Sequence, residues 1–467
     1  MTIQGFYLMP HPPIIIPEVG KGKEAKILST SENLYKIGRE IEKIAPETII
    51  IVTPHGTMFQ DAISLVNEDN IQGSLKNFGV PQVSMNLQVN KVLTERIHEL
   101  AIEENIPTVM ISNTFLKSYK STLSLDHGVI VPLYFVNKYY NNYKIVHITY
   151  APLNDMSLYK FGIILKRAVE ELKEKTVFIA SGDLSHRLKE DGPYEYSPFG
   201  EKFDTEFLNN LKAGDVCSLF KMDEETVCSA GECGRKSAFI MLGALDCKRF
   251  NGELLSYEGT FGVGYGVMKL NILGEEESKL KELEEIKNLR YSKKLNHQDA
   301  FVRLARESLT HFLTTGEQLK ELPDYVTEEM RQNKRGVFVS LKKYRELRGC
   351  IGTISPTTNS IAEEIIRNAI EAATQDPRFS TVEESELLDL DFSVDVLTES
   401  VTASKEELDP KRYGVIVTRK GRRGLLLPDL EGVNTVEEQL SIALKKAGIS
   451  STEPYTIEKF EVIRHKE

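Results

Sequence analysis

Four histidines lie in turns that follow or border apolar, strand-like runs. They occur in the segments "MPHPP", "TPHGT", "LDHGV" and "DLSHR", and they are His11, His55, His127 and His186. In α/β sheets, functional groups collect where strands end and loops begin. A single histidine in a turn is usually an ordinary surface residue, but four in equivalent contexts favour a shared site. Two further histidines, His98 and His147, lie inside expected regular elements instead.

Imidazoles held on a rigid frame are typical metal ligands. His11 stands between prolines that restrict the backbone on both sides, which would preorganise a ligand. Two histidines and one carboxylate form the non-haem Fe(II) arrangement, which leaves positions open for substrate and O2. Glu232 and Cys233 both precede an expected apolar helix and are candidates for the third ligand. Because carboxylate and thiolate prefer different metals, both stay open; Glu258 in "YEGTF" fits an ordinary strand-end residue better.

The first half of the chain must supply the sheet that positions these histidines. Short apolar runs flanked by turn residues predict buried strands in a helix-covered sheet. We expect strands within residues 47–56, 143–153, 176–186 and 257–273, and a covering amphipathic helix over 31–45. The pattern predicts an α/β domain with the histidines at its strand ends.

The ordered motifs "MPHPP", "TPHG", "LDHGVIVPLYF" and "SGDLSH" resemble the catalytic subunit of class III extradiol ring-cleavage dioxygenases and the related Memo proteins. The resemblance covers about residues 4–270. It implies a central sheet covered by helices, with His11 and His55 as metal ligands and Fe(II) as the cofactor. It also implies that His186 is the acid/base residue and that His127 lies near a small-molecule substrate. "ECGR" falls where the dioxygenases place a metal glutamate and Memo proteins a metal cysteine.

Composition narrows the class of protein. The chain has 467 residues, 41% hydrophobic and 27% charged, with a formal net charge of −11. That length favours more than one domain, and the acidic balance argues against broad nucleic-acid backbone binding. We find no signal-like leader and no apolar run of about 20 residues, so we expect no membrane span. Five scattered cysteines fit a reducing, cytoplasmic setting, and an acidic chain of this kind is compatible with a homodimer.

The second half of the chain differs from the first in its sequence pattern and begins after a charge-rich segment. Residues 274–296 are rich in charge and predict a linker or an exposed helix. We therefore divide the chain into a metal domain at 1–273, the linker, and a second domain at 297–467. In the second domain we expect helices within 298–313 and 360–375, two strands around a polar turn within 336–354, and a strand within 389–399. This mixture predicts a compact α+β domain.

The second domain has one motif that could carry chemistry. In "RELRGCIGTISP", Cys350 lies near two glycines, and Arg348 could stabilise its thiolate. Cys350 could equally be a small buried strand residue. In "DPRF", Asp376 and Arg378 could belong to the same site with Phe379, or could simply pair across a turn.

"LRGCIGT", "TQDPRFSTV", "DFSVDVLTE", "GLLLPDL" and "LKKAGI" together resemble the AMMECR family over about residues 295–467. The family fold is α+β in two lobes, and the resemblance implies no particular reaction. By position, its candidate site comprises Arg348, Cys350, Asp376, Arg378 and Phe379. A Memo-like protein, an AMMECR protein and a radical SAM protein commonly form one system, AmmeMemoRadiSam. The resemblance therefore implies a radical SAM partner on another chain, because no CxxxCxxC motif occurs here.

Two functions follow from the sequence. The first is a non-haem iron oxidoreductase of the dioxygenase type, acting on an aromatic or otherwise chelating small molecule. The second is a metal- or partner-binding module related to Memo proteins, without ring-cleavage activity. A carboxylate third ligand favours the first, and a cysteine ligand favours the second.

Overall fold

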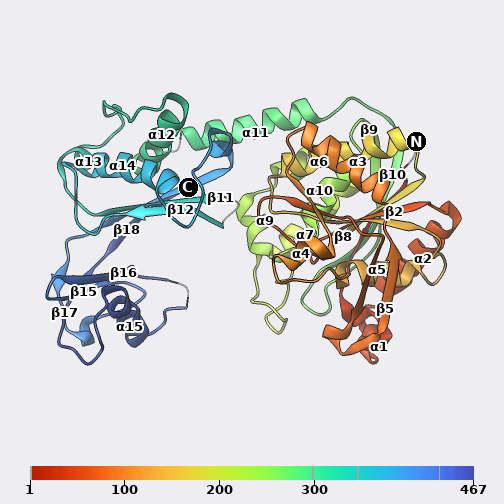
Figure 1. The fold of residues 1–467 in the computed structure, drawn as a ribbon, viewed down its shortest axis with the longest axis horizontal. Coiled ribbons are helices and arrows are strands. Elements are labelled where there is room, and N and C mark those ends of the chain that lie inside the picture. Colours follow the sequence, from red (N-terminus) through yellow and green to blue (C-terminus); the bar gives the residue numbers. More distant parts are fainter. Residues whose placement is uncertain (1–2, 297–298, 344–345, 431) are drawn as a thin grey trace. The chain divides into compact units, whose positions relative to one another are not determined.

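The computed structural model describes residues 3–296, 299–343, 346–430 and 432–467. The chain divides into two compact units, Met1–Lys287 and Asn288–Glu467 (Figure 1). We call them the N-terminal unit and the C-terminal unit. No helix among the described residues combines the length and the apolar character that a membrane crossing requires.

An eight-stranded mixed sheet forms the centre of the N-terminal unit. In spatial order it contains β6 (Thr108–Ile111), β3 (Ile63–Val66), β7 (Lys144–Thr149), β2 (Thr48–Thr53), β8 (Thr176–Ser181), β1 (Ile3–Met9), β10 (Tyr265–Glu275) and β9 (Lys248–Glu258). The four central strands, β7, β2, β8 and β1, run parallel. The predicted strands at 47–56, 143–153 and 176–186 are confirmed as β2, β7 and β8.

Helices cover both faces of this sheet (Figure 1). Strand β2 shows why: Ile50 and Val52 join one buried cluster, whereas Ile49 and Ile51 join the other. The first cluster is formed with α3 (Lys91–Glu103), α6 (Asp155–Leu172), α7 (Phe199–Ala213) and α10 (Arg235–Ala244); the second is formed with α2 (Leu28–Ile44), α5 (His127–Val136) and the hairpin of β4 (Asn70–Leu75) and β5 (Val80–Gln88). A strand buried on both faces needs the near-continuous apolar run of β2, so the α/β prediction is confirmed.

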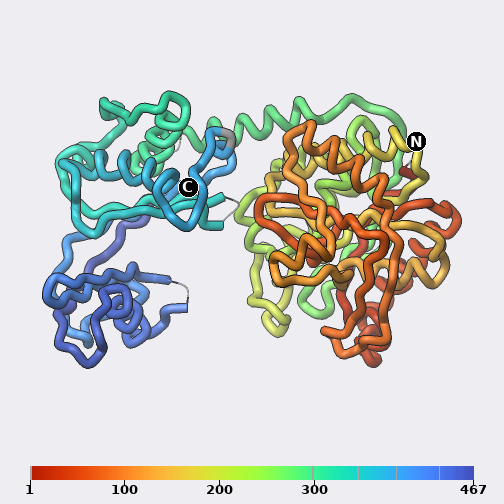
Figure 2. The backbone as a smooth tube through the Cα atoms, in the orientation of Figure 1, coloured from red at the N-terminus to blue at the C-terminus, as the bar shows by residue number. Residues whose placement is uncertain are grey.

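The predicted helix at 31–45 is confirmed as α2, which ends one residue earlier and whose buried face carries Leu34, Ile37 and Ile41 at helical spacing. The strand predicted within 257–273 corresponds to β10, which begins later than the start of the predicted range. Residues 257 and 258 end β9, a turn with a positive-φ Gly262 follows, and β10 begins at Tyr265. Glycines in the segment reverse the chain, and β10 then pairs antiparallel with β1, closing the unit with its last strands (Figure 2).

Helix α11 (Leu280–Leu295) occupies most of the predicted linker. Its first half belongs to the N-terminal unit, where Leu283 and Ile286 join the core. Its last turn belongs to the C-terminal unit, where Lys294 forms an ion pair with Asp391. The chain passes between the two units inside this helix, at residues 287 and 288.

The C-terminal unit contains two antiparallel four-stranded sheets. One has the order β12 (Glu346–Gly352), β11 (Val337–Lys343), β13 (Leu390–Leu397) and β18 (Val462–Lys466); the other has the order β14 (Val401–Thr402), β17 (Thr456–Phe460), β15 (Gly414–Arg419) and β16 (Arg422–Leu426). Helices α12 (Ala300–Thr315) and α14 (Ile361–Thr374) pack on the first sheet, and α15 (Val436–Ala447) packs on the second. The predicted helices and strands of this half are confirmed.

The shorter elements complete the two units. They are α1 (Pro17–Gly20), α4 (Asn113–Lys117), α8 (Val216–Lys221), α9 (Glu224–Ala230), α13 (Glu328–Gln332) and the 3-10 turns Pro13–Ile15, Lys23–Ile27, Lys76–Phe78, Glu384–Asp389 and Lys405–Glu407. Among these, α9 is relevant to the site because residues 231–234, which follow it directly, connect it to α10.

Candidate metal centre

Three adjacent parallel strands end at the same edge of the large sheet. Strands β2, β8 and β1 are neighbours in that order, and their carboxyl ends lead into the segments that carry His55, His186 and His11. Loops at the carboxyl ends of parallel strands form the ligand-binding edge of such sheets. His127, in contrast, does not follow a strand. The apolar run after it was expected to be strand-like, but residues 127–136 form α5, so His127 reaches the site from a helix N-terminus.

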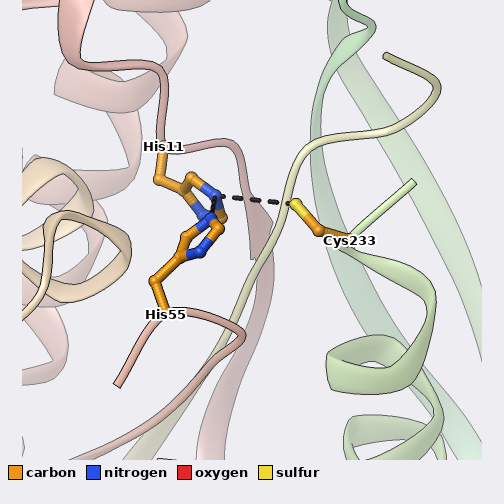
Figure 3. A group of neighbouring side chains, drawn as sticks. All are labelled: His11, His55 and Cys233. Atoms are coloured by element: carbon orange, nitrogen blue, oxygen red, sulfur yellow. Dashed lines mark hydrogen bonds between the residues drawn. The ribbon is translucent and has the colours of Figure 1, made fainter. Parts of the chain in front are cut away.

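His11, His55 and Cys233 turn toward one another (Figure 3). The Nε2 atoms of His11 and His55 are 3.0 Å apart, and Cys233 Sγ lies 3.6 Å from His11 Nε2. The ligand atoms of all three residues lie within 4.8 Å of one another. His11 is buried, Cys233 is half-buried and His55 is the most exposed of the three. This is a candidate His/His/Cys metal site.

A hydrogen-bond chain orients His11. Ser181 Oγ donates to the carbonyl of Gly128, so it accepts from His11 Nδ1 at 2.9 Å. That proton position leaves Nε2 with a free lone pair on the side of His55 and Cys233. Asp183 fixes the backbone at the same point, because the His11 N–H donates to its Oδ1 at 2.8 Å.

Glu232 and Cys233 point in different directions although they are adjacent. The Glu232 carboxylate accepts from the Arg235 N–H at 2.6 Å, which places it at the N-terminus of α10. Cys233 Sγ instead accepts from the Asp183 N–H at 3.3 Å and faces His11. Of the two candidates for the third ligand, the structure brings the cysteine to the histidines. Glu258 binds Thr30 at the start of α2, as an ordinary strand-end residue would.

His127 and His186 complete a cluster of four imidazoles. The ring of His127 stacks on His55 with centroids 4.2 Å apart and contacts Phe78 at 5.2 Å. The ring of His186 stacks on Tyr194 at 5.0 Å. Its Nε2 is buried and lacks a hydrogen-bond partner among the described residues. That nitrogen is therefore available to a bound molecule.

The electrostatics suit a cation. Burial, with the neighbouring histidines, holds the pKa of His11 well below its ordinary value and lowers that of His55 to about 4. Burial and nearby positive groups lower the pKa of His186 to about 4 as well. Burial and the Asp183 carboxyl raise the pKa of the Cys233 thiol well above its ordinary value. The imidazoles are thus neutral donors, and a bound cation would favour the thiolate.

The donor spacing also fits one ion. Two nitrogens bound at about 2.1 Å lie about 3.0–3.4 Å apart for bond angles of about 90–110°. The 3.0 Å between the His11 and His55 nitrogens is within that range. Without an ion or a shared proton, two lone pairs at this distance would repel each other. The residues present therefore fit a divalent metal.

Aspartate side chains form hydrogen bonds with the segments that carry these histidines, and none of these aspartates was predicted from the sequence. Asp183 holds His11, and the buried Asp204 accepts from the Ser185 N–H at 2.8 Å, directly before His186. Asp126, directly before His127, accepts hydrogen bonds from Thr53 and His147. Asp126 and Asp183 stand inside the motifs "LDHGV" and "SGDLSH", so the signal was present in segments of which only the histidines were considered.

The pKa of Asp126 is shifted in the opposite direction from the pKa values of Asp183 and Asp204. Although burial opposes its ionisation, hydrogen bonds from His147 and Thr53 hold the pKa of Asp126 below its ordinary value. Burial raises the pKa values of Asp183 and Asp204 to about 7. Of the three carboxyls, Asp126 is therefore the one held ionised near neutral pH.

In the C-terminal unit, the proposed stabilisation of a Cys350 thiolate by Arg348 is wrong. The Arg348 guanidinium pairs with Glu386 at 2.9 and 3.0 Å and donates to the carbonyl of Ser380 at 2.7 Å. Its charge is satisfied by that carboxylate. Cys350 Sγ accepts from the Ser340 hydroxyl at 3.2 Å in the neighbouring strand.

Asp376 and Arg378 pair with each other at 2.7 Å, as the turn alternative predicted. Asp376 also accepts from the Cys350 N–H at 2.9 Å, which satisfies a donor on edge strand β12. Phe379 lies beside Arg378, with the guanidinium 5.4 Å from the ring centroid. Asp376, Arg378 and Cys350 are thus close together, but their polar groups are used to hold the strand and the turn.

A parallel-centred sheet with neutral histidines and a cysteine at its carboxyl edge defines an α/β protein with a candidate metal site. Comparison with known families makes this specific. Residues 5–268 match the catalytic LigB subunit of aromatic ring-opening dioxygenases, and residues 302–466 match AMMECR1. The chain belongs to the LigB family and carries an AMMECR1 domain after it, which confirms both resemblances.

Individual relatives match either the whole chain or about a third of it. The protein CA_C1420 of Clostridium acetobutylicum is 64% identical over 467 residues, covering 100% of both chains. A protein of Thermotoga maritima is 47% identical over 169 residues, covering 36% of this chain and 97% of the relative. The crystal structure of PH0010 from Pyrococcus horikoshii is 33% identical, covers 36% of this chain and 89% of its own, and has a TM-score of 0.33.

Proposed function

We propose that the N-terminal unit is a non-haem Fe(II)-dependent oxidoreductase that acts on an aromatic or otherwise metal-chelating small molecule. The observation that carries this proposal is the convergence of His11, His55 and Cys233, whose donor atoms lie within 4.8 Å of one another. The low pKa values of the imidazoles support it, because metal ligands must be deprotonated. Membership of a family of ring-opening dioxygenases supports the reaction class.

Bound iron would supply redox chemistry and open coordination positions for a chelating substrate. The remaining work falls to the chain. His186 is neutral near pH 7 and has a buried Nε2 without a partner among the described residues, so it can accept a proton from a substrate hydroxyl. Tyr194 packs on the His186 ring and restricts its orientation. The ring of His127 stacks on His55 and meets Phe78 edge to face at 65°, and these rings offer apolar contacts to an aromatic substrate ring.

A second candidate function rests on the cysteine. A soft thiolate ligand distinguishes this donor set from the two-histidine, one-carboxylate set of non-haem iron oxygenases. The position of Cys233 at 3.6 Å from His11 therefore also supports a Memo-like module that binds metal or a partner without ring cleavage. The two candidates share the metal centre and differ in the reaction.

One set of measurements tests both. Protein produced in iron-supplemented cells should hold about one iron per chain, and His11→Ala and His55→Ala should lower this to background. His98→Ala is the matched control, because His98 bonds Thr108 at 2.7 Å away from the centre. Unchanged iron in both site variants would overturn the metal centre. Iron-loaded protein that gives no ring-fission product from any common catechol would leave the second candidate.

We also propose that the AMMECR1 domain acts in the same process as the metal centre, with a radical SAM protein as a partner on another chain. The fusion of the two domains in this chain, and in the relative from Clostridium acetobutylicum that matches over its full length, supports a shared process. The test is co-purification of a radical SAM protein with the full chain from its own host under anaerobic conditions. Loss of that partner on removal of residues 297–467 would place its contact on the second domain.

A further inference from the structure

Asp126 occupies a helix N-cap without capping the helix. It directly precedes α5, and aspartate is among the preferred N-cap residues. Its side chain forms no capping hydrogen bond and instead turns into the sheet. There Oδ1 accepts from the Thr53 hydroxyl at 2.7 Å, and Oδ2 lies 3.2 Å from His147 Nε2. The helix thus lacks the stabilising side-chain cap that an aspartate at this position usually provides.

This carboxylate is connected to two of the site histidines. Thr53 ends β2, and its Oγ1 accepts from the His55 N–H at 3.2 Å while donating to Asp126. Asp126 is also the residue before His127, whose ring stacks on that of His55 at 4.2 Å. A shift of Asp126 would therefore reach His55 through Thr53 and through His127.

His147 is the other partner of Asp126 and lies in a place where a polar residue is costly. It stands in the middle of β7, next to Ile51 of β2, and is 1% exposed. Its Nδ1 has no partner among the described residues, so the bond to Asp126 is its polar contact there. Burying an imidazole with one nitrogen unsatisfied is unfavourable, and structure that breaks a local rule is often tied to function.

Two glycines keep the group tightly packed. A Cβ on Gly128 would lie 2.3 Å from Thr53 Oγ1, and a Cβ on Gly56 would lie 2.1 Å from Thr149 Oγ1. Both glycines directly follow a site histidine, His127 and His55 respectively. The backbone after His127 therefore packs closely on Thr53, and the backbone after His55 packs closely on Thr149.

We propose that Asp126 and His147 are positioning residues of the metal centre: their buried pair, acting through Thr53, fixes the orientation of His55 and His127. The inference rests on the proposed metal site. Outer partners that orient metal-binding imidazoles typically affect affinity by about 10- to 100-fold. The same range applies here, although Asp126 reaches His55 through one intervening hydroxyl.

Cobalt binding to the full chain tests the proposal. We expect His147→Leu and Asp126→Asn to weaken Co(II) binding about 10- to 100-fold and to shift the d–d bands of the cobalt complex. His147→Gln retains a side-chain donor to Asp126 and should recover part of the affinity. His98→Gln, a histidine change on α3 away from the site, should bind Co(II) like the original protein. Circular dichroism establishes that each variant is folded.

The outcomes separate the two proposals. If the unmodified chain binds no Co(II), the metal centre and this inference both fail. If it binds Co(II), and His147→Leu and Asp126→Asn bind it within about twofold with the same spectrum, only the inference fails. Should His147→Leu not fold, the nearly isosteric Asp126→Asn decides alone. Equal losses in His147→Gln and His147→Leu would contradict a role for the donor and also overturn the inference.

Discussion

The two units contain polar clusters that look alike in sequence and differ in what their side chains do. Around His11, the imidazole nitrogens of His11 and His55 face the sulfur of Cys233, a residue 222 positions from His11 along the chain. Around Cys350, the charged residues form pairs: Arg348 binds Glu386, and Asp376 binds Arg378. Nitrogen and sulfur atoms that converge can take a metal ion, whereas charges that neutralise each other hold the fold. The comparison therefore assigns chemistry to the first cluster and stability to the second.

The largest expected effect separates Cys233 from Glu232. We expect Cys233→Ala to lower the affinity for iron by more than about 100-fold, because it removes one of three converging donors. Glu232→Gln should retain iron, since that side chain accepts from the Arg235 N–H at the start of α10. Metal analysis after gel filtration measures both. Iron lost from the glutamine variant and kept by the alanine variant would reverse the assignment of the third ligand.

Of the four central parallel strands, the sequence predicted β7, β2 and β8 but not β1. These three strands, and the histidines in turns beside apolar runs, could be found because both depend on short local patterns. Strand β2 is a continuous apolar run that ends just before His55, so the run and the turn together locate the residue. The sequence could not show whether Glu232 or Cys233 faces His11. The two residues are adjacent, and the backbone conformation before α10 decides which side chain points toward that histidine. The sequence also could not show the contacts of Asp126 with Thr53 and His147, because an aspartate before a helix normally caps that helix.

In the C-terminal unit the sequence predicted two helices, α12 and α14, and three strands, β11, β12 and β13. It made no prediction for α13, α15 or β14 to β18, and it misjudged one side chain. Arg348 is two residues from Cys350, and sequence proximity suggested a contact. Its actual partner, Glu386, is 38 residues away along the chain. Partners brought together by tertiary packing carry no local sequence signal, whereas the turn pair of Asp376 and Arg378 is local and was anticipated.

The second prediction tests whether the Arg348 pair is structural. Despite burial, hydrogen bonds from Arg348 and Lys343 lower the pKa of Glu386 to about 2. A lowered carboxyl pKa stabilises the fold above the unfolded-state pKa of about 4.5, and this contribution is lost as pH falls toward 2. Glu386→Gln should therefore lower the free energy of unfolding by about 3 kcal/mol at pH 7.

Urea unfolding of the full chain at several pH values measures this difference. It should stay constant from pH 7 to about 5 and shrink between pH 4.5 and 2, as the wild-type carboxylate becomes protonated. Iron content should not change. A difference that is independent of pH throughout would contradict the charge pairing as its cause.

Asp376→Ala should have a somewhat smaller effect, about 2 kcal/mol, because it leaves the Cys350 N–H and the exposed Arg378 guanidinium without their acceptor. Asp376→Asn is the matched control, since its amide oxygen can still accept from the Cys350 N–H, and it should lose less. Denaturant unfolding gives both values, with iron content again unchanged. Loss of iron on Asp376→Ala would contradict the assignment of a metal-binding role to the cluster around His11 and a structural role to the cluster around Cys350.

The smallest expected effect is at Cys350 itself. Its Sγ accepts one hydrogen bond from Ser340, and a serine hydroxyl in the same place could accept it as well. Cys350→Ser should thus change the free energy of unfolding by less than about 1 kcal/mol. Its neighbour provides the contrast: a Cβ on Gly349 would lie 2.1 Å from the Ala372 carbonyl oxygen of α14, so Gly349→Ala should cost more, about 1–3 kcal/mol.

Unfolding curves for Cys350→Ser and Gly349→Ala decide what "LRGCIG" is for. If the glycine variant is the more damaged one, the motif serves the close packing of β12 against α14, and its cysteine is a small residue that fits. If Cys350→Ser leaves stability intact and yet abolishes an activity of the full chain, the thiol performs chemistry after all. The second unit would then contain a reactive group that is not activated by a neighbouring arginine, since both Arg348 and Arg378 are paired with carboxylates.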